Sequence, residues 1–254
     1  MAIIELRDIS KSYGSFQALQ GINLSINEGE VTCVLGDNGA GKSTLIKVLS
    51  GLHEPTSGQI LVDGSAVRFS SPRDAIARGI ATVHQNLAIV NEMSVWRNFF
   101  LGQEITGPLG TLKAESMRRI CGEQLREMGI SIPDVDVEAG TLSGGQRQVV
   151  AIARAVYFGA RVLILDEPTA ALGVKQSGVV LRFVAAARDR GVGVVLITHN
   201  PHHAYLVGDH FTILKLGRQE LDVPRREVSL DNLTLRMAGG GELEELSHEL
   251  RREP

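Results

Sequence analysis

The chain has 254 residues and a formal net charge of −3, from 26 basic and 29 acidic side chains. Apolar residues make up 43% and charged residues 22%, which excludes a disordered, collagen-like or coiled-coil chain. The nearly balanced charge and an aromatic content of 4% argue against a nucleic-acid partner.

The cysteine pattern and the N-terminal residues predict where in the cell the protein works. Cys33 and Cys121 are far apart and fit no metal or redox spacing, as is typical of a reducing compartment. Residues 1–10 carry charges where a signal peptide would be apolar, and no window reaches the roughly 18–20 uncharged apolar residues of a membrane span. We therefore expect a cytoplasmic protein that works at a membrane only through a partner.

The N-terminal part contains a strand–loop–helix unit. Three segments have the alternation or the short apolar run of strands: residues 2–9, 21–26 and 31–35. A glycine-rich turn at 36–41 follows the third of them. A helix is then expected from Lys42 to about Gly51, with its apolar residues on one side.

A β-hairpin is predicted next, at residues 58–69. Asp63 and Gly64 mark its turn, because Asp-Gly is among the strongest short hairpin signals. A short helix at 72–78 and a buried strand at 80–84 follow.

From residue 87 to 158 the pattern becomes helical. Helical patterns at 94–101 and 113–128 flank a loop rich in Gly and Pro, and a further helix follows Ser143. We interpret 87–158 as a helical insertion in a core formed by 1–86 and 159–238.

The remaining elements alternate as in a parallel α/β sheet. The apolar run 161–165 is typical of a strand buried on both faces. A helix at 174–189, a strand at 194–197 and a hairpin formed by 211–216 and 219–223 follow it. Residues 239–254 are expected to form a flexible, charged tail.

Residues 36–43 match the phosphate-loop pattern G-x-x-x-x-G-K-[ST] without a mismatch, between a strand and a helix. Such a loop wraps phosphates with backbone N–H groups, while Lys42 reaches the outer phosphates and Ser43 ligates Mg²⁺. Because sequence and context both match, we favour this over a glycine-rich turn without a ligand. The predicted nucleotide-binding residues here are Gly36, Asn38, Gly39, Ala40, Gly41, Lys42, Ser43 and Thr44.

An acidic pair, Asp166 and Glu167, ends the apolar run at 161–165. Ligands of open parallel sheets lie beyond the carboxyl ends of the strands, which puts this pair beside the phosphate loop. Asp166 suits Mg²⁺, and Glu167 is placed to polarise or deprotonate the attacking water.

A second phosphate-binding helix N-terminus is predicted at 142–146. Ser143 is a good N-cap, and the two glycines after it leave backbone N–H groups bare. One mononucleotide site does not need two such termini, so the second is expected to serve a nucleotide held by another copy. Its nucleotide-binding residues are Ser143, Gly144, Gly145 and Gln146.

With these motifs in this order, residues 3–220 resemble ABC-type ATPases. The resemblance implies a P-loop NTPase core with a mostly parallel sheet, an N-terminal antiparallel β part and the helical insertion. It implies that Tyr13 stacks on adenine, that Gln85 links Mg²⁺ and water to the insertion, and that His199 contacts the γ-phosphate. The implied metal ligands are Ser43, Gln85 and Asp166, and the implied catalytic residues are Glu167, His199 and Gln85. His84, His202 and His203 match no motif and are expected to be structural or exposed.

The resemblance also implies partners. ATP would lie in a head-to-tail dimer, between the phosphate-loop side of one copy and Ser143 and Gly145 of the other. The segments 167–174 and 85–90 resemble those of bacterial monosaccharide importers, which often carry two ATPase units. This chain carries one, so it would pair with itself. Gly173 stands where the family commonly has Asp, which puts the coupling between the two sites in doubt.

The function that this resemblance implies is ATP hydrolysis that powers import of a sugar or similar solute. Integral permease subunits would hold the chain at the cytoplasmic face of the membrane, in a system with an extracytoplasmic solute-binding protein. Four apolar residues of the insertion either line the permease-docking groove or form the insertion's own core: Val95, Trp96, Phe99 and Phe100.

Three alternatives belong to other classes. A soluble ABC ATPase of DNA repair or translation would usually have coiled-coil insertions or tandem units. A P-loop kinase or GTPase switch would have no role for residues 142–146 or His199. A catalytically weak regulatory subunit is supported only by Gly173.

Overall fold

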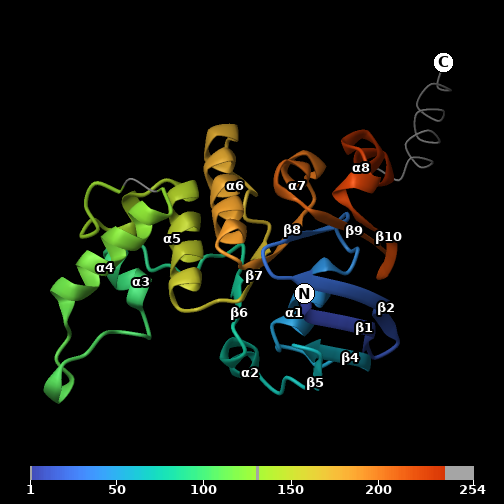
Figure 1. Ribbon diagram of the computed structural model, residues 1–254, viewed down its shortest axis with the longest axis horizontal. Helices are drawn as coiled ribbons and strands as arrows, with labels where there is room; N and C mark the ends of the chain where they lie inside the picture. The colour runs from blue at the N-terminus through green and yellow to red at the C-terminus, as the bar shows by residue number, and fades with distance from the viewer. Residues whose placement is uncertain (1, 130–131, 238–254) are drawn as a thin grey trace.

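The computed structural model describes residues 2–129 and 132–237, and the expected tail at 239–254 lies outside these ranges. A six-stranded sheet in the order β10-β9-β3-β8-β7-β6 forms the centre of the molecule (Figure 1). Its strands are β3 (Val31–Leu35), β6 (Ile80–Val83), β7 (Val162–Asp166), β8 (Gly193–Thr198), β9 (His210–Lys215) and β10 (Arg218–Pro224). Every pair in it is parallel except β9 with β10, so the expected mostly parallel sheet is confirmed.

A four-stranded antiparallel sheet, ordered β2-β1-β4-β5, packs beside it. Its strands are β1 (Ala2–Tyr13), β2 (Phe16–Asn27), β4 (Ser57–Val62) and β5 (Ser65–Val67). The hairpin turn at Asp63 and Gly64 is confirmed, but the first two strands are longer than predicted. Register shifts between Leu6 and Ile9 and again beyond Ile9 interrupt the strict alternation on which the prediction rested.

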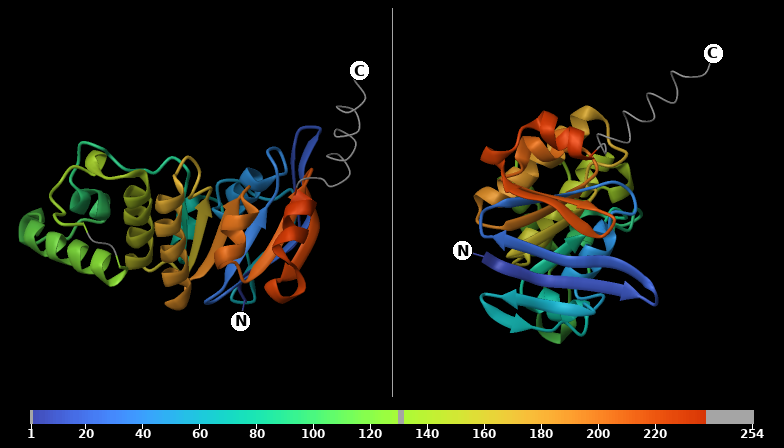
Figure 2. Two further views of the ribbon diagram at one scale, coloured as in Figure 1. Left: turned by 90° about the horizontal axis from the view of Figure 1, so that it is seen from above. Right: turned by 90° about the vertical axis from the view of Figure 1, so that its right-hand side faces the viewer.

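Two groups of helices complete the fold. One group flanks the sheets: α1 (Lys42–Leu49), α2 (Pro72–Ala77), α6 (Val174–Asp189), α7 (Pro201–Val207) and α8 (Leu230–Met237). The other lies together at one end of the molecule: α3 (Val95–Phe100), α4 (Ala114–Glu127) and α5 (Gly144–Tyr157) (Figures 1 and 2). Short 3₁₀ turns occur at Pro108–Gly110, Ala139–Thr141 and Arg225–Glu227. The predicted helices are confirmed, whereas α7 and α8 were not predicted.

The strands of the parallel sheet are buried on both faces, as the apolar runs predicted. In β3, Cys33 and Leu35 face a core shared with α6 and α7, whereas Val34 faces a core shared with α1 and the antiparallel sheet. Burial also raises the pKa of the Cys33 thiol far above its ordinary range, so this cysteine is an inert core residue.

The aromatic residues of α3 form the core of the helical end. Val95, Trp96, Phe99 and Phe100 are all fully or almost fully buried, in one cluster with α4 residues such as Cys121. Of the two alternatives for these residues, the core of the insertion is therefore confirmed, and the docking groove is not. The physical reason is that the helical end needs a hydrophobic core of its own, and these side chains supply it.

Within residues 2–129 and 132–237, no helix is both long enough and apolar enough to cross a bilayer.

Candidate active site

The parallel register brings four chain segments to one edge of the sheet. Leu35 pairs with Thr198, Asp166 pairs with Ile197, and Val83 pairs with Leu165. The residues that follow these strand ends therefore emerge together. They are the phosphate loop after β3, His199 after β8, Glu167 after β7, and Gln85 shortly after β6.

The phosphate loop has backbone angles that favour glycine. Gly36 has φ 149° and Gly41 has φ 107°, and a Cβ at Gly36 would collide with the carbonyl oxygen of Leu214. The helix that follows has no acidic residue in its first turn and no side-chain cap. Its first N–H groups are therefore available to an anion.

Lys42 lies inside this loop. Its side chain is only 8% exposed, and Nζ donates hydrogen bonds to the carbonyl oxygens of Gly36 at 2.7 Å and Asp37 at 3.0 Å. Next to it, Ser43 is exposed and Thr44 half-buried on the first turn of α1. The loop thus presents an ammonium group and hydroxyl groups at the place where phosphates would bind.

Asp166 is a half-buried carboxylate at the end of β7. Burial raises its pKa, the neighbouring charge of Glu167 adds to this, and His84 and Lys42 oppose it. The Nδ1 atom of His84 lies 4.0 Å from Oδ2 of Asp166. A carboxylate in this position would gain from a cation, which would compensate for its lost hydration.

Glu167 makes a short contact with His199 across two loops. Its Oε1 atom is 2.9 Å from Nδ1 of His199, and its backbone N–H donates to the carbonyl oxygen of Ile197. The second carboxylate oxygen, Oε2, is buried and finds no hydrogen-bond partner in the described part of the chain. A buried acceptor without a donor is costly, so this oxygen is suited to accept a hydrogen bond from a water molecule.

Gln85 and Tyr13 are the remaining residues predicted for this side of the site. Gln85 is exposed directly beyond His84. Tyr13 ends β1, is 40% exposed, and has the ammonium group of Lys11 at 5.3 Å from its ring centre and the ring of His53 at its edge. The β2 strand that pairs with β1 touches the phosphate loop, since a Cβ at Gly41 would lie 2.9 Å from the carbonyl oxygen of Ala18.

The segment 142–146 is not brought to this edge. Ser143 caps α5, with its hydroxyl accepting from the N–H of Gln146 at 3.3 Å and the Gln146 side chain returning a bond to the N–H of Ser143. A Cβ at Gly144 would meet the side chain of Leu172, and one at Gly145 would meet Gln176, so this helix N-terminus packs on the segment that follows β7. Along the horizontal axis of Figure 1, α6 separates α5 from α1.

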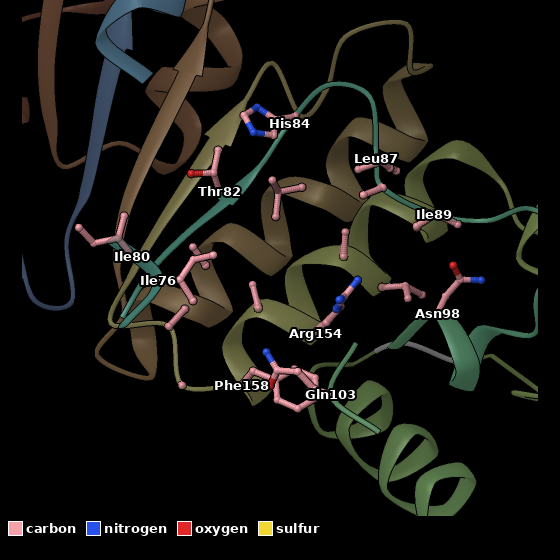
Figure 3. A pocket seen from close by; sticks show the side chains of 18 of the residues that line it. Ile76, Ile80, Thr82, His84, Leu87, Ile89, Asn98, Gln103, Arg154 and Phe158 are labelled. Carbon is pink, nitrogen blue, oxygen red and sulfur yellow. The ribbon is translucent and has the colours of Figure 1, made fainter. Parts of the chain in front are cut away.

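A cavity of about 320 Å³ lies between the β6 edge of the sheet and α5 (Figure 3). It is lined largely by apolar side chains, among them Leu87, Ile89 and Phe158, with the guanidinium of Arg154 among them. Arg154 donates a hydrogen bond to the carbonyl oxygen of Leu101 at 2.6 Å. We call this cavity the β6–α5 groove. Residues 86–89, which line it, come directly after Gln85, so one short segment connects the groove to the edge of the sheet where the phosphate loop lies.

Two histidines have contacts that the sequence analysis missed. His84 lies beside Asp166, and the Nδ1 atom of His203 is 2.9 Å from Oγ1 of Thr169. The position of His84 was available from the sequence, because parallel pairing of 80–84 with the run before Asp166 sets the two side by side. Nothing in the sequence signals the contact between His203 and Thr169.

Comparison with known proteins identifies relatives over most of the chain. The model of the ABC transporter family matches residues 19–170. The xylose/arabinose import ATP-binding protein of Sulfolobus acidocaldarius is 42% identical, over 91% of this chain and 92% of that protein. The fructose import ATP-binding protein of Rhizobium meliloti is 40% identical, over 94% and 95%. The ribose import ATP-binding protein of Bacillus subtilis is 38% identical over 93% of this chain, which spans 48% of that longer protein.

Solved structures agree with the fold. An ATP-binding cassette of an ABC transporter in its ADP conformation matches with a TM-score of 0.80 and 25% identity, over 96% of this chain and 98% of that one. A dimeric post-hydrolysis cassette bound to ADP and phosphate matches with a TM-score of 0.73 and 27% identity, over 88% and 99%.

Proposed function

The chain belongs to the ABC transporter family, and from this we propose that it is the ATP-hydrolysing subunit that powers import of a sugar through a separate membrane permease. The import function rests on the relatives, which carry import names whether they match this chain over their full length or over half of it. The ATPase activity rests on the edge of the sheet where the phosphate loop, Asp166, Glu167 and His199 meet.

In this proposal, the phosphate loop holds the triphosphate. The N–H groups of Gly39, Ala40 and Gly41 and of the first turn of α1 donate to the phosphate oxygens, and Lys42 supplies a positive charge. Tyr13 stacks on adenine with its exposed side. Asn38, in the phosphate loop, and Thr44, in the first turn of α1, contribute to the same phosphate-binding segment.

The residues at this edge fit a magnesium ion. Ser43, Gln85 and Asp166 offer hydroxyl, amide and carboxylate oxygens, the donors that Mg²⁺ prefers, and the desolvated carboxylate of Asp166 would gain from a cation. Bound there, Mg²⁺ would neutralise charge that develops on the phosphates during transfer.

Glu167 acts on the attacking water. Its unpartnered Oε2 accepts a proton from the water as the new P–O bond forms and the bond to the ADP oxygen breaks. His199, which is 60% exposed at its side chain and bonded to Glu167, turns to the γ-phosphate and helps orient it. Glu167 keeps its place because its backbone N–H donates to the carbonyl oxygen of Ile197 in β8.

We further propose that two copies enclose the nucleotides head to tail. Ser143, Gly144, Gly145 and Gln146 of one copy would complete the site of the other. Supporting this, the N-terminus of α5 packs against Leu172 and Gln176, and a related cassette is dimeric.

The permease would dock at the groove between β6 and α5. An apolar groove that opens beside the nucleotide edge suits a short helix from a cytoplasmic loop. The segment after Gln85 would carry the nucleotide state to that helix, and the helical part 87–158 would move against the core 1–86 and 159–238. The chain would thus sit on the cytoplasmic face of the membrane, in a system that includes an extracytoplasmic solute-binding protein.

The observation that carries the proposal is the contact between Glu167 and His199 beside the phosphate loop. Glu167→Gln keeps the shape of the side chain and removes its basicity. We expect ATP binding to be kept and turnover to fall by about 10²–10⁴-fold, measured as phosphate release by the purified protein. Wild-type turnover in this variant would show that a residue other than Glu167 is the general base.

A further inference from the structure

Two side-chain contacts join the segment that follows β7 to the segment that follows β8. The first is Glu167 with His199, at 2.9 Å. The second joins the hydroxyl of Thr169 to Nδ1 of His203, also at 2.9 Å. One loop leaves β7 and the other leaves β8, so the contacts form two adjacent cross-links beyond the ends of neighbouring parallel strands.

The second contact is built on fixed groups. Thr169 is 7% exposed and lies in a tight turn, in which the N–H of Ala170 donates to the carbonyl oxygen of Glu167. His203 lies in the first turn of α7, where its own N–H donates to the side chain of the N-cap residue Asn200 at 3.1 Å. Each partner is therefore held by its local backbone before the two side chains meet.

The His203 ring is suited to a neutral hydrogen bond. Burial, and then the neighbouring His202 and His199, lower its pKa below the ordinary value. At neutral pH the ring is therefore uncharged, and it exchanges one hydrogen bond with the hydroxyl of Thr169.

In the proposed mechanism, the first cross-link opens during hydrolysis and the second does not. The proposed mechanism needs His199 to leave Glu167 and turn to the γ-phosphate, which opens the first cross-link. No part of that mechanism asks Thr169 or His203 to move. The second cross-link would then continue to hold the β8–α7 loop on the Glu167 turn while the first is open.

We propose that His203 is a positioning residue that, through Thr169, keeps the base-bearing turn and the His199 loop in register during hydrolysis. The inference rests on the proposed ATPase function. It predicts that losing this hydrogen bond slows turnover without weakening nucleotide binding, because neither side chain belongs to the phosphate loop.

The test compares Thr169→Val, which removes the hydroxyl at nearly constant volume, with Thr169→Ser, which keeps it. His203→Ala removes the other partner, and His202→Ala is the matched control on the exposed side of the same turn. We expect kcat for ATP to fall about 10–100-fold in Thr169→Val and His203→Ala, with KM unchanged, as for a small misplacement of reacting groups. Thr169→Ser and His202→Ala should keep most of the wild-type kcat.

The double variant Thr169→Val/His203→Ala should be no slower than either single variant, because both remove one bond. Wild-type kcat in both single variants, multiplicative losses in the double variant, or a Thr169→Ser enzyme as slow as Thr169→Val would each overturn the inference. Thermal unfolding of every variant separates slow turnover from loss of fold. If the wild-type protein hydrolysed no ATP, the proposed function would fail instead.

Discussion

Lys42 holds a large part of the site's charge, and it is bound to its own loop. Its ammonium group lies against two backbone carbonyl oxygens, at 2.7 and 3.0 Å, in a largely buried position. These carbonyl groups solvate the charge before a nucleotide arrives. The loop is thus kept in a wrapped shape, ready to receive phosphates, by the residue that will bind them.

Lys42→Ala should therefore abolish ATP binding, because it removes both the charge and the two bonds that shape the loop. Isothermal titration with ATP measures this directly. Lys47→Ala is the control, since Lys47 is an exposed lysine of the same helix. Wild-type affinity in Lys42→Ala would contradict the predicted site.

Part of the candidate site could be predicted from the sequence, and part could not. The phosphate loop and the acidic pair were predictable because each motif has a fixed order of glycines, cations and carboxylates next to a strand end. The hydrogen bond between Thr169 and His203 was not predictable, because it depends on how α7 packs against the turn after β7. For Trp96 the sequence left both a docking groove and a core open, since an aromatic side chain suits an interface and a core equally well.

Helix α3 shows the consequence for Trp96. Trp96 is 2% exposed, its indole N–H donates to Asp136 at 2.9 Å, and the guanidinium groups of Arg97 and Arg118 lie over its ring at 5.2 and 4.9 Å. Trp96→Ala should lower the free energy of unfolding by about 3–5 kcal/mol, measured by chemical denaturation. Trp96→Phe keeps most of the apolar volume and should lose less. Unchanged stability in Trp96→Ala would contradict the core role of Trp96 and favour the docking alternative.

The hairpin of β9 and β10 carries a pH-dependent pair. The hydrogen bond from His210 to Asp222 raises the pKa of the histidine. A raised folded-state pKa gives stability that is fully present below the unfolded value of about 6.5 and lost as pH rises through the folded value. The loss of unfolding free energy in His210→Gln should thus be larger at about pH 5.5 than at about pH 9. Because the pair is partly exposed, this loss of unfolding free energy should not exceed about 1 kcal/mol. An equal loss at both pH values would show that the charge contributes nothing.

Most elements followed from periodicity, and the exceptions have physical causes. The run before Asp166 and the helix Val174–Asp189 were predicted closely because an apolar run and an amphipathic repeat identify them. Helix α7 was missed because Pro201–Val207 is too short to show a repeat, and its start is set by the Asn200 cap. The bulges of β1 similarly hid its second half.

At the scale of the whole molecule, the proposed dimer joins the phosphate loop of one copy to the Ser143 helix N-terminus of the other. Light scattering on Glu167→Gln should show the mass doubling from 27.4 kDa when ATP and Mg²⁺ are added. Adding Ser143→Arg to that variant should keep it monomeric, because a bulky cation would block the shared site. A Glu167→Gln protein that binds ATP and stays monomeric would show that pairing needs the permease.

The position of β3 has a consequence for how the protein is made. The strand that carries the phosphate loop lies between β8 and β9, and both come from the last quarter of the chain or close to it. On the ribosome, the loop is synthesised early but lacks both neighbouring strands until β8 and β9 have emerged. A nascent chain therefore cannot capture ATP before that point, and fragments that end before β8 should not bind it.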